Sequence, residues 1–147
     1  MLYHAVGIDY KGDPYQTPSG KGRKYFKKIA LITINSSNRE ECIHAIRKEL
    51  MEMGRLVDLD GAENLLNVFI SMHPKIAKFF YSGKWASLQF ADSTIMNNIL
   101  RSLRKLNIVG LPIHDSIIAK KSDKDVVSQI MRDKYREQFK FDPILNV

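Results

Sequence analysis

Gly110-Leu-Pro-Ile-His-Asp-Ser-Ile-Ile-Ala119 is the stretch of sequence that decides the fold of this chain. Two β-prone apolar segments flank His114-Asp115 with almost no residues between them, which predicts a tight antiparallel hairpin over about residues 108–119. Asp115 would then lie at the tip of the hairpin, where a carboxylate can bind a divalent cation. In the alternative, Asp115 only makes the turn, by hydrogen bonding from the backbone to its own side chain, and His114 has only a structural role.

The composition is typical of a single folded domain. The chain has 147 residues, of which 44% are hydrophobic and 27% charged, so we expect one domain over residues 1–147 with its own core. No apolar run approaches the ~20 residues that span a bilayer. No secretory leader is visible either, so no membrane partner is expected. Cys42 is the single cysteine, which excludes an internal disulfide and favours a cytoplasmic location.

The net charge of +7 favours polyanionic partners, and nucleic acid above all. Basic residues gather at two places along the chain. The first group is Lys21, Arg23, Lys24, Lys27 and Lys28, and the second is Arg101, Arg104 and Lys105. We predict that Lys24 and the second group contact nucleic acid. The alternative is a plain basic helical protein whose charged faces are only solvated.

Hydrophobic residues at helical spacing follow the N-terminal segment, residues 1–19. Thr17-Pro18 predicts a helix start, because Thr can cap a helix and Pro suits its first position. The helix would run to about residue 35, with Arg23 and Lys27 on one face and Phe26, Ile29 and Ala30 toward the core. The β-branched run Ile29–Ile34 leaves a strand as the alternative.

Further helix starts are predicted by capping patterns. Ser37 with Glu40, repeated by Asn38 with Glu41, indicates one helix. Another helix start is predicted at Asp60, and a further one at Ser122 with Asp125. The longest predicted helix is Trp85–Leu106, with Gln89 and Asp92 on its polar side. Residues 141–147 are predicted to form a closing strand. The expected fold class is α+β and predominantly helical, with about five or six helices around the small antiparallel hairpin. Residues 49–85 carry no motif that indicates a function.

Three of these predicted features suit phosphoryl transfer. This chemistry needs basic side chains to hold a triphosphate and carboxylates to hold metal ions. Arg23 and Lys27 share a helix face, Asp92 lies on the longest helix, and Asp115 lies at the hairpin tip. Each feature is weak evidence by itself, since a basic helix face is usually just solvated.

The order of three motifs resembles a known family. They are Arg23-x-x-x-Lys27 followed by Ile29–Ile34 and Asn35-Ser36; Leu88-Gln89-Phe-Ala-Asp92; and Ile113-His114-Asp115-Ser116. Together they resemble the palm and fingers of family A polymerases, the DNA polymerase I class, whose fold is shared with phage-type single-subunit polymerases. The motifs resemble, in turn, the fingers helix that grips nucleotide phosphates, the palm helix that touches template and primer, and the metal-binding third motif. The resemblance extends over nearly the whole chain.

The resemblance implies a role for each matching residue. Asp115 would be a catalytic ligand of Mg²⁺ or Mn²⁺ beside His114. Arg23, Lys27 and Asn35 would bind a nucleoside triphosphate, and Gln89 would contact primer-template DNA. Residues 17–35 would then be the fingers-type helix, and residues 85–147 the palm-type helix, hairpin, helix and strand.

The sequence also departs from the family pattern. The Asp-containing first motif has no counterpart here, so we expect another polypeptide to supply that principal metal ligand. Asn35-Ser36 replaces the Tyr-Gly pair of the family, and Ser116 stands where DNA-synthesising members carry Glu, which leaves DNA or RNA as the product open. The expected function is a polymerase-like fragment that binds DNA and nucleoside triphosphate, with nucleotidyl transfer only when the missing Asp is supplied. The alternative is a catalytically inactive nucleic-acid-binding module of a phage or mobile element.

Overall fold

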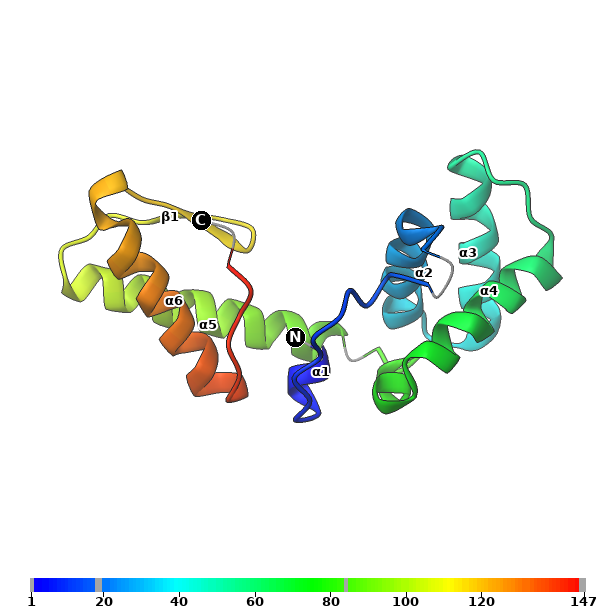
Figure 1. Ribbon diagram of the computed structural model, residues 1–147, viewed down its shortest axis with the longest axis horizontal. Helices are drawn as coiled ribbons and strands as arrows, with labels where there is room; N and C mark the ends of the chain where they lie inside the picture. Colours follow the sequence, from blue (N-terminus) through cyan, green and yellow to red (C-terminus); the bar gives the residue numbers. More distant parts are fainter. Residues whose placement is uncertain (1, 18–19, 84, 146–147) are drawn as a thin grey trace. The chain divides into compact units, whose positions relative to one another are not determined.

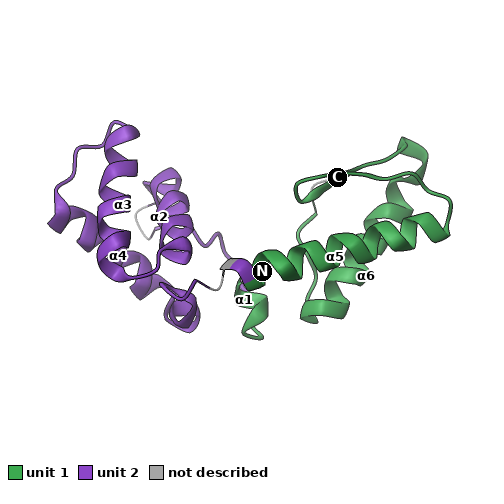
Figure 2. Ribbon diagram, turned by 180° about the vertical axis from the view of Figure 1, so that it is seen from behind, with its two compact units in different colours: residues 1–9, 87–147 green, residues 10–86 purple. Residues whose placement is uncertain are grey.

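A computed structural model describes residues 2–17, 20–83 and 85–145 of the chain. The chain divides into two compact units, of which unit 1 comprises residues 1–9 and 87–147 and unit 2 comprises residues 10–86 (Figure 2). The described residues form six α-helices, two short 3₁₀ helices and one two-stranded antiparallel sheet (Figure 1). The predicted α+β, mainly helical fold class is confirmed. The single domain stays a prediction, because a division by packing does not tell whether the units fold separately.

Unit 2 is a cluster of three helices that pack on one another. They are α2 (Arg23–Asn35), α3 (Arg39–Glu52) and α4 (Leu59–Met72), followed by the 3₁₀ helix η1 (Pro74–Phe79). Phe26, Ile29 and Ala30 of α2 are buried as predicted, and the run Ile29–Ile34 is helical rather than a strand. The rest of this core includes Cys42, Ile46, Leu50, Leu66 and Phe69.

Helix α2 begins at Arg23 and not at Thr17. Gly20 and Gly22 both have left-handed backbone conformations, with φ of 69° and 87°, and such residues interrupt a right-handed helix. The Thr17 hydroxyl donates to the carbonyl of Lys21 at 2.7 Å instead of capping a helix. Pro18, the other half of the predicted start, lies outside the described residues.

Helix α3 begins at one of the two predicted capping pairs, whereas α4 is capped two residues before its predicted start. At α3 the side chain of Asn38 accepts a hydrogen bond from the Glu41 amide at 2.9 Å, while the Glu41 carboxylate accepts one from the Ser37 amide at 3.0 Å. At α4 the cap is Asp58, which accepts from the Gly61 amide at 2.8 Å. The predicted pair Asn38 and Glu41 therefore caps α3, and Asp58 rather than Asp60 caps α4.

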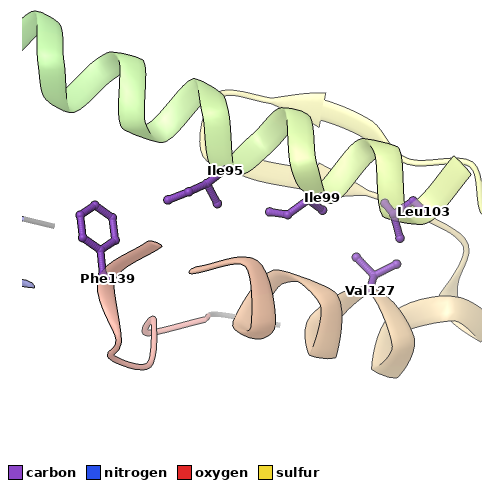
Figure 3. Packing of buried hydrophobic residues seen from close by; sticks show 5 residues of the cluster. All are labelled: Ile95, Ile99, Leu103, Val127 and Phe139. Atoms are coloured by element: carbon purple, nitrogen blue, oxygen red, sulfur yellow. The ribbon is translucent and has the colours of Figure 1, made fainter. Parts of the chain in front are cut away.

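Unit 1 consists of two long helices with the hairpin beside them. Its elements are α1 (Leu2–Ala5), α5 (Trp85–Lys105), β1 (Leu111–Ile113), β2 (Ser116–Ile118), the 3₁₀ helix η2 (Lys121–Asp123) and α6 (Lys124–Phe139). The core lies between α5 and α6, where Ile95, Ile99 and Leu103 face Val127 and Phe139 (Figure 3). Three apolar residues at helical spacing on α5 are thus buried, whereas Leu106, the predicted end of this helix, is 55% exposed.

The hairpin forms at the predicted place. Leu111 pairs with Ile118 and Ile113 with Ser116, which leaves His114-Asp115 as the two-residue turn. Gly110 admits the close approach of α5, because a Cβ atom there would lie 2.7 Å from Leu103 Cδ1 and 3.1 Å from Ile117 Cγ2. The absence of a side chain at Gly110 therefore sets how closely the hairpin lies against the helix.

The predicted C-terminal strand does not form over residues 141–145, which have no regular secondary structure. The sheet of the described residues contains only β1 and β2, and the segment pairs with neither of them. Pro143 also lacks the amide hydrogen that a strand position inside a sheet requires. Residues 146 and 147 of the predicted strand lie outside the described residues.

Candidate metal and nucleic-acid site

Asp115 lies at the hairpin tip as predicted. The preceding His114 has a left-handed backbone with φ of 53°, which two-residue hairpin turns require at their first position and which costs a non-glycine residue free energy. Both side chains are exposed. The turn therefore presents the carboxylate to solvent at a fixed place.

A second carboxylate, that of Asp92 on α5, faces the same groove as Asp115. This groove of unit 1 has a volume of about 340 Å³. Its polar lining residues are His4, Asp92, Asp115 and Tyr135, and its apolar ones include Ile95, Met131 and Ile144. The long helix, the hairpin and the C-terminal segment thus converge on two acids that are far apart in sequence.

The two acids interact electrostatically. Asp92 is exposed as a residue, but partial desolvation raises the pKa of its carboxyl group, and the negative charge of Asp115 raises it further. The pKa of Tyr135 is also raised, first by burial and then by the charge of Asp92. A carboxylate pair with this mutual repulsion is stabilised by a bound cation, because the cation offsets the charge that each acid imposes on the other.

His4 forms the wall of the groove and has partners of its own. Its Nδ1 lies 2.7 Å from the Tyr135 hydroxyl, and its ring stacks on Phe141 with centroids 4.8 Å apart. Its Nε2 lies 3.7 Å from Asp9 Oδ1. These contacts join α1 to α6 and to the C-terminal segment, so His4 holds the groove together.

Asp92→Asn is expected to stabilise unit 1 near neutral pH. The folded pKa of Asp92 is raised, so the stability that protonated Asp92 contributes is lost as pH rises through the window between its ordinary and its raised pKa. The amide of the variant has no charge to desolvate. The difference in unfolding free energy between variant and wild type should therefore disappear at pH values below that window. Urea unfolding of both proteins from acidic to neutral pH measures this, and a constant difference at every pH would contradict it.

The groove supplies some of the oxygen ligands that a hard divalent cation needs. Mg²⁺ binds oxygen ligands, commonly through one or two carboxylates with water and substrate phosphates completing its shell. Asp92 and Asp115 supply two such carboxylates in one groove. Across residues 2–17, 20–83 and 85–145, no group of three or more His, Cys, Asp or Glu side chains could hold a metal ion. A cation held by this pair would take its remaining ligands from water or substrate.

Unit 2 carries a separate basic groove of about 640 Å³ on α2. Its cations are Arg23, Lys24, Lys27 and Lys28, and Tyr15 and Leu31 are among its other lining residues. Arg23 is paired with Asp13 and lies over the Tyr15 ring at 5.6 Å. The Arg23 side chain, followed by the Tyr15 amide, lowers the pKa of Asp13 by hydrogen bonding. Arg23 and Lys27 thus share a groove, as their spacing predicted.

The charges of this groove are partly neutralised within unit 2. Lys28 pairs with Glu49 at 2.6 Å, and Lys24 lies 4.8 Å from the centre of the Tyr25 ring. Asn35, the third predicted nucleotide-binding residue, ends α2 and is not among the residues that line the groove. A triphosphate in this groove would therefore meet Lys27 and Lys24 first, and would compete with Asp13 for Arg23.

The predicted nucleic-acid-binding residues of α5 are all exposed. Gln89 lies about one helical turn before Asp92. Arg101 and Arg104 are exposed on the last turns of α5. Lys105 lines a groove of about 320 Å³ that also contains Asp133, Lys134 and Glu137, and Lys134 pairs with Glu137 at 2.7 Å. A phosphate at Lys105 would therefore meet charges of both signs.

Sequence reasoning placed Asp92 on the polar side of a helix but not among the metal ligands. It also gave no role to His4 or to Tyr135. The sequence signals for Asp92 were its carboxylate, which suits phosphoryl transfer, and its position one turn after Gln89 on the polar side of a long helix. That pattern fixes the face on which Asp92 lies, but not that this face meets the hairpin.

Among the described residues, no helix is both long enough and apolar enough to cross a membrane. No protein-family model, no curated protein and no solved structure matches this chain.

Proposed function

We propose that this protein is a polymerase-like fragment that binds nucleic acid and nucleoside triphosphate with a divalent cation. The observation that carries the proposal is the Asp92–Asp115 pair, which two distant segments bring to one groove and whose charges repel. Mg²⁺ or Mn²⁺ bound there would supply positive charge that stabilises phosphate oxygens. The motif resemblance and the net charge of +7 add support, and a cytoplasmic location belongs to the same proposal.

Nucleotidyl transfer would need a further carboxylate from another polypeptide. The described residues offer two acids in the groove and no larger group. The hairpin offers a docking place, since Leu111, Ile113 and Ile118 are 59%, 49% and 55% exposed and a two-stranded hairpin has two unpaired edges. The isolated chain should therefore not extend a primer. Template-dependent extension by a clean preparation would contradict this part of the proposal.

The metal site is tested by titrating the protein with Mn²⁺. Binding is detected by isothermal calorimetry or by the electron spin resonance signal of the free ion. Asp115→Asn and Asp92→Asn are each expected to weaken Mn²⁺ binding by about tenfold or more, because each removes one charged ligand. Asp125→Asn is the matched control, since Asp125 is an exposed acid of the same unit that does not line the groove.

The alternative function is a nucleic-acid-binding module without catalysis, which the absence of a third ligand among the described residues favours. In that case DNA would bind with a steep salt dependence, while Mn²⁺ binding would be the same for wild type and Asp115→Asn. If neither DNA nor Mn²⁺ binds, the protein is a basic helical protein with a structural turn.

A further inference from the structure

A second hollow of unit 1 also reaches the hairpin tip and is lined by lysines. It has a volume of about 350 Å³ and is bounded by β2, η2, the first turns of α6 and the C-terminal segment. Its polar lining consists of Lys120, Lys121, Lys124, Ser116, Ser128 and Asp115. Because the three lysines follow one another closely in the chain, their charges act on the same small space.

The hollow is lined by three lysines and by one acid, Asp115. Among the residues that the structure describes, no carboxylate lies within ion-pairing distance of Lys120, Lys121 or Lys124. All three are exposed. The neighbouring acids Asp123 and Asp125 do not line the hollow. Three unpaired cations in one concave surface favour a polyanion.

The hollow adjoins the carboxylate groove. Asp115, Met131, Ile144 and Leu145 line both, so the lysines and the carboxylate pair border the same hairpin tip. Ile144 is 92% exposed where the two meet, although an apolar side chain gains free energy by leaving water. An occupant that touches Ile144 with an apolar part and the lysines with an anionic part would satisfy both.

We propose that this lysine hollow binds the sugar–phosphate backbone of a single nucleic-acid strand and guides it toward Asp115. This inference rests on the proposed function in one respect, namely that the bound strand leads to the Asp92–Asp115 carboxylate pair. The volume is at the small end of the ~300–1,000 Å³ range of ligand pockets, which suits a short stretch of one strand and not a double helix. The lining contains no aromatic side chain on which bases could stack, so binding should depend little on base sequence.

Fluorescence anisotropy with a labelled oligothymidylate, in EDTA and without nucleotide, tests the proposal. The triple variant Lys120→Gln, Lys121→Gln, Lys124→Gln is expected to bind at least tenfold more weakly near 0.1 M salt. Its plot of log affinity against log salt should be shallower by about 2, since each strand phosphate contact contributes about 0.7 to that slope. An oligodeoxyadenylate should give the same changes.

A matched triple variant controls for net charge. Lys48→Gln, Lys75→Gln, Lys78→Gln also removes three positive charges, from exposed positions of unit 2, and should leave the slope unchanged. Asp115→Asn should strengthen strand binding in EDTA, because it removes the one negative charge of the hollow. This expected gain in strand affinity distinguishes the strand inference from the metal proposal, in which Asp115→Asn loses Mn²⁺ binding.

Three results would overturn the inference. Equal losses in both triple variants would mean that only net charge attracts the strand. A duplex of the same length that binds more tightly through the same lysines would exclude a single-strand groove. Binding to vesicles with anionic headgroups that exceeds strand binding and depends on the three lysines would identify a membrane surface instead. Because all of these measurements omit metal, they leave the Asp92–Asp115 proposal to be decided by its own titration.

Discussion

Leu103→Ala is expected to destabilise unit 1 by about 2–5 kcal/mol, the range for truncating a fully buried leucine to alanine. Leu103 is 1% exposed and faces Val127 across the core (Figure 3). It also contacts the hairpin at Gly110, so a cavity there would loosen both α6 and the hairpin that carries Asp115. Urea unfolding gives the free energy, and amide hydrogen exchange shows whether α5 and α6 lose protection.

Leu106→Ala is the matched control for this change. It removes the same atoms one helical turn later, from a side chain that is 55% exposed, and should cost less than about 0.5 kcal/mol. Equal costs for Leu103→Ala and Leu106→Ala would contradict the core assigned to unit 1.

A double-mutant cycle with Gly110→Ala sharpens the same prediction. Alone, Gly110→Ala should destabilise by about 1–3 kcal/mol, the usual cost of overpacking, because its Cβ would lie 2.7 Å from Leu103 Cδ1. In the Leu103→Ala background that atom is gone, so the added methyl should cost much less. Additive effects would mean that the hairpin does not rest on Leu103.

Replacing both Arg23 and Lys27 by Gln should weaken binding of a nucleoside triphosphate on the order of a hundredfold, about tenfold for each charged contact. Both cations line one groove of unit 2, and a triphosphate carries enough negative charge to engage them together. Calorimetric titration with ATP and Mn²⁺ measures the change. Arg47→Gln with Lys48→Gln removes the same two residue types from exposed positions of α3 and should have little effect.

Because Arg23 pairs with Asp13, a substitution at Asp13 is expected to change triphosphate affinity in the opposite direction. Because Asp13 occupies the Arg23 guanidinium, a phosphate must displace it, and Asp13→Asn should strengthen triphosphate binding. Asn35→Ala should leave affinity unchanged, since Asn35 does not line the groove. Weaker binding in Asp13→Asn would show that Asp13 positions Arg23 for the ligand instead of competing with it.

Local features of the fold could be predicted from the sequence because they depend on neighbouring residues. The hairpin of residues 111–118 follows from two β-prone segments around a two-residue turn. The burial of Phe26 and Ile29 follows from helical spacing. The predicted helix start at Thr17 was wrong because Gly20 and Gly22 outweigh a favourable cap. The predicted strand after Phe139 was wrong because strand formation needs a partner, and a propensity does not supply one.

The sequence by itself determined that Asp115 lies at a hairpin tip and that Asp92 lies on the polar side of a long helix. Only the tertiary structure decided that these two acids share a groove, and that Lys120, Lys121 and Lys124 line the hollow beside it. The physical reason is the difference between local and long-range interactions. Turn geometry and helical period act within a few residues, whereas the meeting of α5 with the hairpin depends on how Leu103, Gly110 and Val127 pack together.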